Sequence, residues 1–214
     1  MFMRTFAVFA LCWFLFSPFV DANSLEITDL PIPWTEERIR LTEEYAETHY
    51  GTTQTEIVPQ AVVIHWTAAD TWESTYAHFY GAERDDGTLN VASHFLVDRD
   101  GTVYRLTSET ALNRHIIGYN WCAIGIENVG GSDGTDDLTQ EQLEANAGLI
   151  AYLREKYPTI QYVFGHYQQD AAKESGLYIE NVPGYRSEKI DPGAAFMRKL
   201  REETDGLGVV FFPE

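Results

Sequence analysis

The sequence predicts a single α/β domain with a central mixed β-sheet flanked by helices. Short apolar strands alternate with helical segments along the chain, an order typical of such sheets. The run Val62-Val63-Ile64 suits a central strand covered on both faces, and a long amphipathic helix begins near Thr139. A chain of 214 residues, 44% hydrophobic and 14% aromatic, fits one compact domain better than two.

The first half of the chain contains two predicted helices, at residues 35–49 and 71–80. The first has Thr35 as its N-cap, acidic residues in its first turn and Gly51 just beyond its end. Before it, residues 23–34 are a proline-containing lead-in. Strand patterns occur at 57–65, 92–98 and 102–106, and the turn signal Asp100-Gly101 joins the last two as a hairpin.

The second half begins with a strand at 123–129 and a loop at 130–137 that is rich in Gly and Asp. Thr139 and Gln142 form a capping-box pattern at the start of the long helix, which Pro158 ends. The remaining predicted segments are a strand at 162–166, a long polar stretch to residue 189, a helix from 194 to about 201, and an apolar tail at 209–212.

The net charge of the chain excludes some classes of binding partner. The formal net charge is −18 and the isoelectric point is near 4.6, so the surface should repel nucleic acid and anionic lipid. The acidity fits a well-solvated soluble surface, and it also fits adaptation to salt; the sequence leaves both readings open. We expect a monomer.

The first residues resemble an export signal. Arg4 precedes an almost wholly apolar run at 6–20, and Val20-Asp21-Ala22 resembles a cleavage site, so we expect residues 1–22 to be removed. The mature protein would then be periplasmic or secreted, without stable membrane association; an uncleaved anchor is the alternative. We divide the rest into a lead-in and helix (23–56), a main domain (57–205) and a tail (206–214). Removal of the signal would leave Cys122 as the single cysteine, so no internal disulfide is expected.

Two of the six histidines lie where ligand sites form in open sheets, at the ends of predicted strands. His65 ends the first central strand, and His166 ends the strand that begins at residue 162. Two imidazoles and a carboxylate can hold zinc, and Asp191 is the candidate carboxylate. In an extended segment, Lys189 and Asp191 would point to the same side. Spacing alone does not distinguish this set from ordinary structural histidines.

Glu127 is the other notable acid. Alternation along the strand places it on the same face as the small residues Ala123 and Gly125, opposite to Ile124 and Ile126. The small neighbours leave room for a ligand or a water beside the carboxylate. A solvent-exposed edge position is the alternative reading.

Five short motifs occur in order along the chain. They are Ile64-His65-Trp66-Thr67, the stretch from Ser93 to Gly101, Ile124-Gly125-Ile126-Glu127, Gly165-His166, and Lys189-Ile190-Asp191-Pro192-Gly193. In this order they resemble the type 2 N-acetylmuramoyl-L-alanine amidases, a superfamily that includes phage amidases and animal peptidoglycan recognition proteins. The resemblance spans roughly residues 60–200.

The resemblance implies a zinc-dependent enzyme that cleaves the amide bond between N-acetylmuramic acid and L-alanine in cell-wall peptidoglycan or its muropeptide fragments. One zinc ion would be held at the strand ends by His65, His166 and Asp191. Glu127 and Lys189 match the catalytic glutamate and lysine.

The resemblance also implies roles for other histidines. His115 matches a family histidine that we interpret as a substrate or oxyanion contact, and His94 matches one that we interpret as structural support; His49 and His78 match nothing functional. We further assign Trp66, next to His65, and Tyr185, in the long polar stretch, to substrate contact.

Two departures from the family pattern affect this reading. Ser93 stands where some branches have a catalytic tyrosine, so Glu127 should carry the acid–base role. The stretch between His166 and Lys189 is longer than in small family members, and it either edges the substrate groove or is an idle insertion. Two other functions stay open: a muropeptide-binding protein without catalysis, and an exported zinc peptidase that acts on stem peptides.

Overall fold

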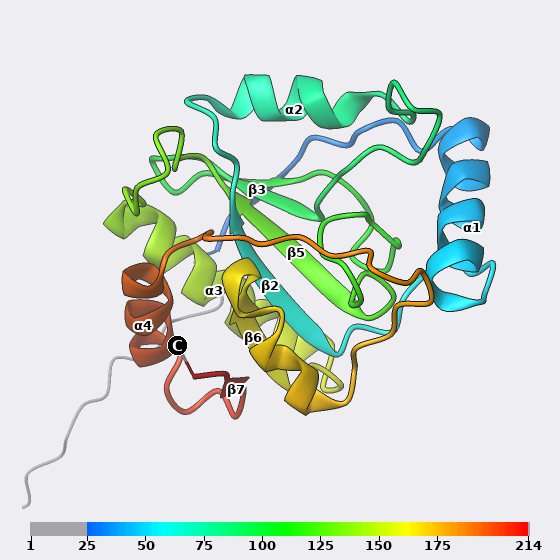
Figure 1. Ribbon diagram of the computed structural model, residues 1–214. Coiled ribbons are helices and arrows are strands. Elements are labelled where there is room, and N and C mark those ends of the chain that lie inside the picture. Colours follow the sequence, from blue (N-terminus) through cyan, green and yellow to red (C-terminus); the bar gives the residue numbers. More distant parts are fainter. Residues whose placement is uncertain (1–24, 214) are drawn as a thin grey trace, which may run out of the picture.

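A seven-stranded mixed β-sheet forms the centre of the computed structural model, which describes residues 25–213 (Figure 1). The strand order is β1-β4-β3-β5-β2-β6-β7. Neighbouring strands run parallel except β3 and β4, which form the expected hairpin. The strands are β1 Ile27–Asp29, β2 Ala61–Trp66, β3 Phe95–Val97, β4 Val103–Arg105, β5 Ala123–Asn128, β6 Tyr162–Gly165 and β7 Val210–Phe211.

In the described part of the chain, four α-helices flank this sheet, so the predicted mixed sheet covered by helices is confirmed (Figure 1). Thr35 accepts a hydrogen bond from the backbone N–H of Arg38 as the N-cap of α1, and Gly51 ends that helix in the left-handed conformation. Thr139 and Gln142 form the predicted capping box of α3. The helices are α1 Glu36–Tyr50, α2 Trp72–Tyr80, α3 Gln140–Lys156 and α4 Ala194–Glu203.

The central strand β2 is covered on both faces, which explains its uninterrupted apolar run. Val62 and Ile64 face a large core cluster to which α1, α3 and α4 contribute, whereas Ala61 and Val63 face a second cluster around Tyr119. Because side chains alternate along a strand, His65 shares the face of Ala61 and Val63. The site histidine therefore lies on the face opposite to that covered by α3.

Both edge strands of the sheet come from segments that we did not predict to be strands. The lead-in supplies β1, which pairs with β4, and the tail supplies β7, which pairs with β6. With three and two residues, they are too short to show an alternating pattern in the sequence. Strand β2 also begins at Ala61 instead of residue 57, because Pro59 offers no backbone N–H to a ladder.

The predicted export signal at residues 1–22 lies outside the described residues. Within residues 25–213, no helix combines the length and the apolar character that crossing a membrane requires. Cys122 is a buried free thiol, as expected for a small apolar side chain, and burial raises its pKa well above the usual range.

The capping box of α3 provides a test of the fold. Replacing Thr139 by Ala removes the side-chain acceptor for the N–H of Gln142 and a hydrogen bond to the carbonyl of Arg99. We expect Thr139→Ala to lower the free energy of unfolding by about 1–2 kcal/mol, measured by urea denaturation. Thr53→Ala, at an exposed position outside the helices, is the control and should change little; equal effects of the two substitutions would contradict the assignment.

Candidate metal centre and cleft

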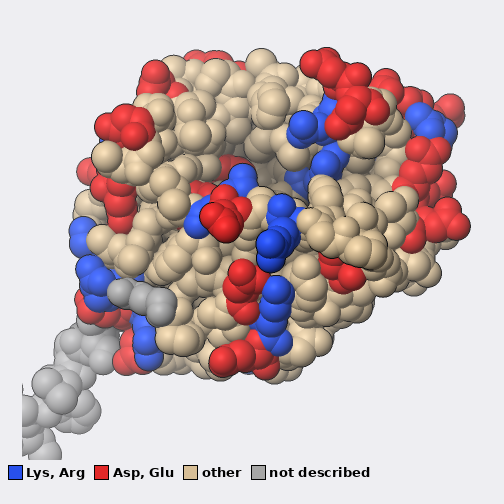
Figure 2. Space-filling model, viewed as in Figure 1, with Lys and Arg blue, Asp and Glu red and all other residues tan. Residues whose placement is uncertain are grey.

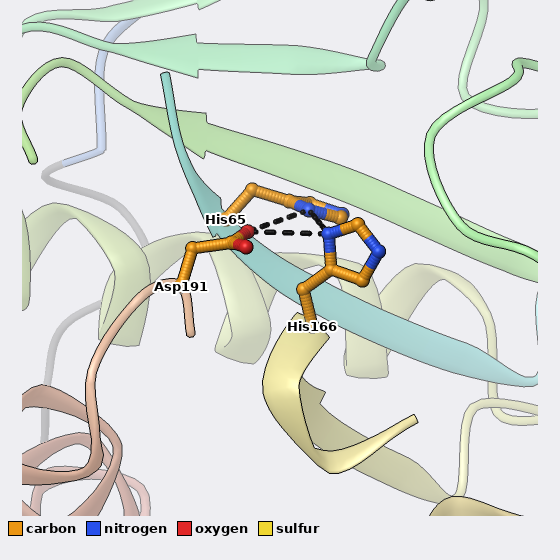
Figure 3. A group of neighbouring side chains, drawn as sticks. All are labelled: His65, His166 and Asp191. Atoms are coloured by element: carbon orange, nitrogen blue, oxygen red, sulfur yellow. Dashed lines mark hydrogen bonds and ion pairs between the residues drawn. The ribbon is translucent and has the colours of Figure 1, made fainter. Parts of the chain in front are cut away.

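Three side chains of metal-ligand type meet at the carboxyl ends of β2 and β6 (Figure 3). His65 is the penultimate residue of β2, His166 directly follows β6, and Asp191 precedes α4. The Nδ1 atoms of the two histidines lie 2.9 Å apart, and Oδ2 of Asp191 lies 3.3 Å from Nδ1 of His65 and 3.2 Å from Nδ1 of His166. All three residues are buried.

The spacing of these donor atoms is compatible with one metal ion. Two donors held about 2.0–2.1 Å from a tetrahedral zinc ion lie roughly 3.3 Å from each other. The three separations within this group are 2.9, 3.2 and 3.3 Å. Two nitrogen donors and one carboxylate also leave further coordination positions open, as in catalytic zinc sites.

The protonation states of the group also suit a cation. Burial disfavours the charged form of His65 and lowers its pKa to about 4, so its ring is neutral near pH 7. Burial opposes ionisation of Asp191, but the polar contacts of its carboxyl with the imidazoles of His166 and His65 outweigh this effect and hold the pKa of Asp191 well below the usual value. Neutral imidazoles and an ionised carboxylate are the forms that bind a metal.

The glycine before His166 allows the chain to bring Asp191 close. A Cβ atom on Gly165 would lie 2.8 Å from the Pro192 ring and about 2.9 Å from the Tyr167 ring. In addition, the backbone N–H of Tyr167 donates to the carbonyl of Asp191 at 3.0 Å. The Gly165-His166 pair thus lets the segment before α4 pack against the end of β6.

Glu127 faces the same region from β5. It pairs with His65 across the parallel ladder, and its side chain is partly buried. Among the described residues, its Oε2 atom has no hydrogen-bond partner. Burial raises the pKa of Glu127 well above the usual value, the charge of Asp191 raises it further, and Lys189 opposes both. A carboxyl in such a position can act as a general acid or base.

A cleft with a volume of about 330 Å³ connects these groups. Lys189 is exposed at its edge, and α2 contributes to its wall through Ser74 and His78. Arg114 also lines the cleft, and we did not assign it to the site from the sequence. Its position next to His115 was the feature of the sequence that could have indicated it. In Figure 2, basic side chains lie beside the hollow of this face, while many acidic side chains lie along its outer edges.

The family model described as N-acetylmuramoyl-L-alanine amidase matches residues 54–194, well over half of the chain. The match includes the three clustered side chains together with Glu127 and Lys189. The chain belongs to the N-acetylmuramoyl-L-alanine amidase family.

Phage endolysins are among the similar proteins. The endolysin of Enterobacteria phage K11 is 35% identical over 79 residues, and that of Escherichia phage T7 is 36% identical over 78 residues. Each match covers 35% of this chain and 52% of the endolysin. The chain thus spans about half the length of the curated relatives that it matches.

Solved structures share the fold. The N-acetylmuramoyl-L-alanine amidase LysC from Clostridium intestinale URNW has a TM-score of 0.57 and 20% identity, with 86% of this chain and 99% of that chain covered. An AmpD derivative has a TM-score of 0.53 and 21% identity, with 83% and 94% covered.

In this member of the amidase family, the ring of His115 occupies the space beside Gly125. Its Nδ1 atom lies 3.0 Å from Nε2 of His65, and its Nε2 atom lies 3.1 Å from the carbonyl oxygen of Ala123. The room that we attributed to a ligand or a water beside the small residues of β5 is therefore filled by this imidazole. Both ring nitrogens already have protein partners, so neither is available to an oxyanion without a rearrangement.

The two aromatic residues assigned to substrate contact lie in different places. Trp66 lines the cleft and packs on the backbone of Gly131, where a Cβ atom would lie 2.3 Å from the indole. Tyr185 lines an adjoining hollow instead, where its hydroxyl accepts a hydrogen bond from Arg114 at 2.9 Å. Arg114 borders both spaces, and contact of either aromatic residue with substrate stays a prediction.

The long polar stretch lies beside this site. Residues 176–190, which we call the crossing segment, pass in front of the sheet between α1 and α4 (Figure 1). Near one end, Glu180 pairs with His49 of α1 at 2.9 Å; beyond the other end follows Asp191. His49 is therefore a buried anchor of this segment, whereas His78 is exposed on α2.

His94 is fully buried and has two backbone partners. Its Nδ1 accepts from the N–H of Gly125 at 2.9 Å, and its Nε2 donates to the carbonyl of Ala111 at 2.8 Å. These contacts join β5 to the loop before it, as expected of structural support. Burial lowers the pKa of His94 from 6.5 to about 4.

The lowered pKa of His94 predicts a pH-dependent stability. As the pH falls below 6.5, the unfolded chain takes up a proton at His94 while the folded chain does not, so stability is lost between pH 6.5 and about 4. We expect this residue to contribute about 3 kcal/mol to that loss in metal-free protein. Urea denaturation from pH 7 to 4.5 should give a flatter pH profile for His94→Gln than for wild type; parallel profiles would contradict the assignment.

Proposed function

We propose that this chain is a zinc-dependent amidase that hydrolyses the bond between N-acetylmuramic acid and L-alanine in peptidoglycan or muropeptides. The observation that carries the proposal is that the buried group of His65, His166 and Asp191 lies in one cleft with Glu127, whose Oε2 atom has no hydrogen-bond partner within residues 25–213. Membership of the amidase family supports the choice of bond.

His65, His166 and Asp191 would hold the zinc ion. When bound, zinc lowers the pKa of a water molecule and polarises the amide carbonyl. The buried ligands hold their donor atoms within about 3.3 Å of one another without help from solvent.

Glu127 would move the proton in this reaction. Its carboxylate takes a proton from the attacking water as the water oxygen bonds to the carbonyl carbon. The same carboxyl then gives this proton to the L-alanine nitrogen as the carbon–nitrogen bond breaks. Burial raises the pKa of Glu127, and the charge of Lys189 opposes this effect and favours the ionised form that accepts the proton.

Lys189 would stabilise the negative charge that develops on the carbonyl oxygen. Its ammonium group lines the cleft and acts electrostatically on both Glu127 and His65. A single well-placed donor of this kind contributes roughly 3–4 kcal/mol to the transition state. We also propose that the protein is exported to the periplasm or secreted, and that it acts as a monomer.

Two substitutions distinguish the proton-transfer role of Glu127 from the zinc-binding role of Asp191. Glu127→Gln keeps the shape of the side chain but cannot accept the proton, so we expect turnover of a purified muropeptide to fall by roughly 100-fold or more. Zinc should remain at one ion per chain, measured by inductively coupled plasma mass spectrometry. Asp191→Ala should instead lose both zinc and turnover.

Glu47→Gln is the matched control for Glu127→Gln, because it removes the same charge from an exposed position on α1. It should retain wild-type turnover and zinc content. Wild-type turnover in Glu127→Gln would exclude Glu127 as the acid–base group, and unchanged zinc in Asp191→Ala would exclude Asp191 as a ligand.

A further inference from the structure

Three consecutive polar contacts lead from the backbone of β5 to the proposed metal ligands. The carbonyl oxygen of Ala123 lies 3.1 Å from Nε2 of His115. Nδ1 of His115 lies 3.0 Å from Nε2 of His65, and Nδ1 of His65 faces His166 and Asp191. His115 and His65 thus each use both of their ring nitrogens.

The carbonyl group fixes where the protons in this series lie. A carbonyl oxygen only accepts, so the proton on the His115 ring must be at Nε2. His115 is partly buried in the wall of the cleft, and its polar neighbours are a carbonyl oxygen and other imidazoles. A second proton, with its positive charge, would lack compensation among these neighbours. Nδ1 of His115 is therefore an acceptor, and Nε2 of His65 must carry the proton that it accepts.

We propose that His115 is a positioning residue that holds His65 in the tautomer with its proton on Nε2 and its lone pair on Nδ1. That lone pair faces the donor atoms of His166 and Asp191. The inference rests on the proposed zinc site, because the lone pair on Nδ1 is the one that the ion would use. Ligand histidines commonly donate their second N–H to a fixed acceptor; here the acceptor is a third imidazole, itself set by the backbone.

Gly125 makes this arrangement possible. A Cβ atom at this position would lie 2.7 Å from Nδ1 and 2.8 Å from Cγ of His115, closer than such atoms approach. The ring therefore lies directly on the strand, between the carbonyl of Ala123 and the side chain of His65. His94 also contacts this position: its Nδ1 accepts a hydrogen bond from the N–H of Gly125, and its ring centroid lies 5.7 Å from that of His115.

The first test is spectroscopic and uses the wild-type protein without metal. Long-range ¹H–¹⁵N correlation spectra of protein labelled at its histidines report which ring nitrogen carries the proton. We expect both His65 and His115 to be protonated at Nε2 at pH 7.5. A proton on Nδ1 of His65, or a doubly protonated His115, would overturn the proposal.

The second test compares two substitutions at the same position. His115→Asn retains an oxygen acceptor near the place of Nδ1, whereas His115→Leu retains bulk but accepts nothing. We expect the leucine variant to bind zinc about 10–100-fold more weakly than wild type, in competition with a chromophoric chelator. The asparagine variant should stay close to wild type.

Thermal unfolding of both metal-free variants checks that the chain is folded. Zinc binding by the leucine variant as tight as that of wild type would contradict the proposal. So would an equal loss in both variants, because packing of the ring and not its acceptor atom would then be responsible. Failure of wild type to bind zinc would instead reject the proposed function, while the spectra would still decide the tautomer of His65.

Discussion

The parallel pairing of β2 with β5 and β6 is the constraint on which the site depends. Ile64 pairs with Gly165, so the residues that follow, His65 and His166, emerge side by side at the same edge. The ladder with β5 sets His65 opposite Glu127. His65 and Glu127 are 62 positions apart in the sequence, and Glu127 and His166 are 39 apart. The backbone pairing of the strands brings these residues together. The segment before α4 then adds Asp191, and Gly165 gives it space to approach.

Burial gives these groups their chemical character. The same exclusion of water keeps His65 neutral, favours the protonated form of Glu127, and makes the ionised Asp191 depend on its imidazole partners. Such a group of buried polar atoms contributes little to stability by itself and is retained where chemistry requires it. The apolar clusters on both faces of β2 provide the rigid support.

Local signals in the sequence predicted the parts of this structure that depend on neighbouring residues. The caps of α1 and α3, the buried strand β2 and the hairpin at Gly101 follow from short patterns. The resemblance to the amidase family, carried by the order of the motifs, predicted one site for His65, His166, Asp191 and Glu127. The edge strands β1 and β7 were missed because two or three residues carry no periodicity. The contact of His115 with His65 was also missed. It depends on how the loop before β5 folds back onto Gly125, and the sequence showed only that space existed there.

The most direct test of the account is mass spectrometry of a purified muropeptide after incubation with the protein, with and without a chelator. The account predicts release of an intact stem peptide with a free L-alanine amino group, and loss of this release when the chelator is present. A muropeptide that binds but stays uncut would indicate a receptor, and cleavage within the peptide would indicate a peptidase. Either of these results would contradict the proposed amidase activity.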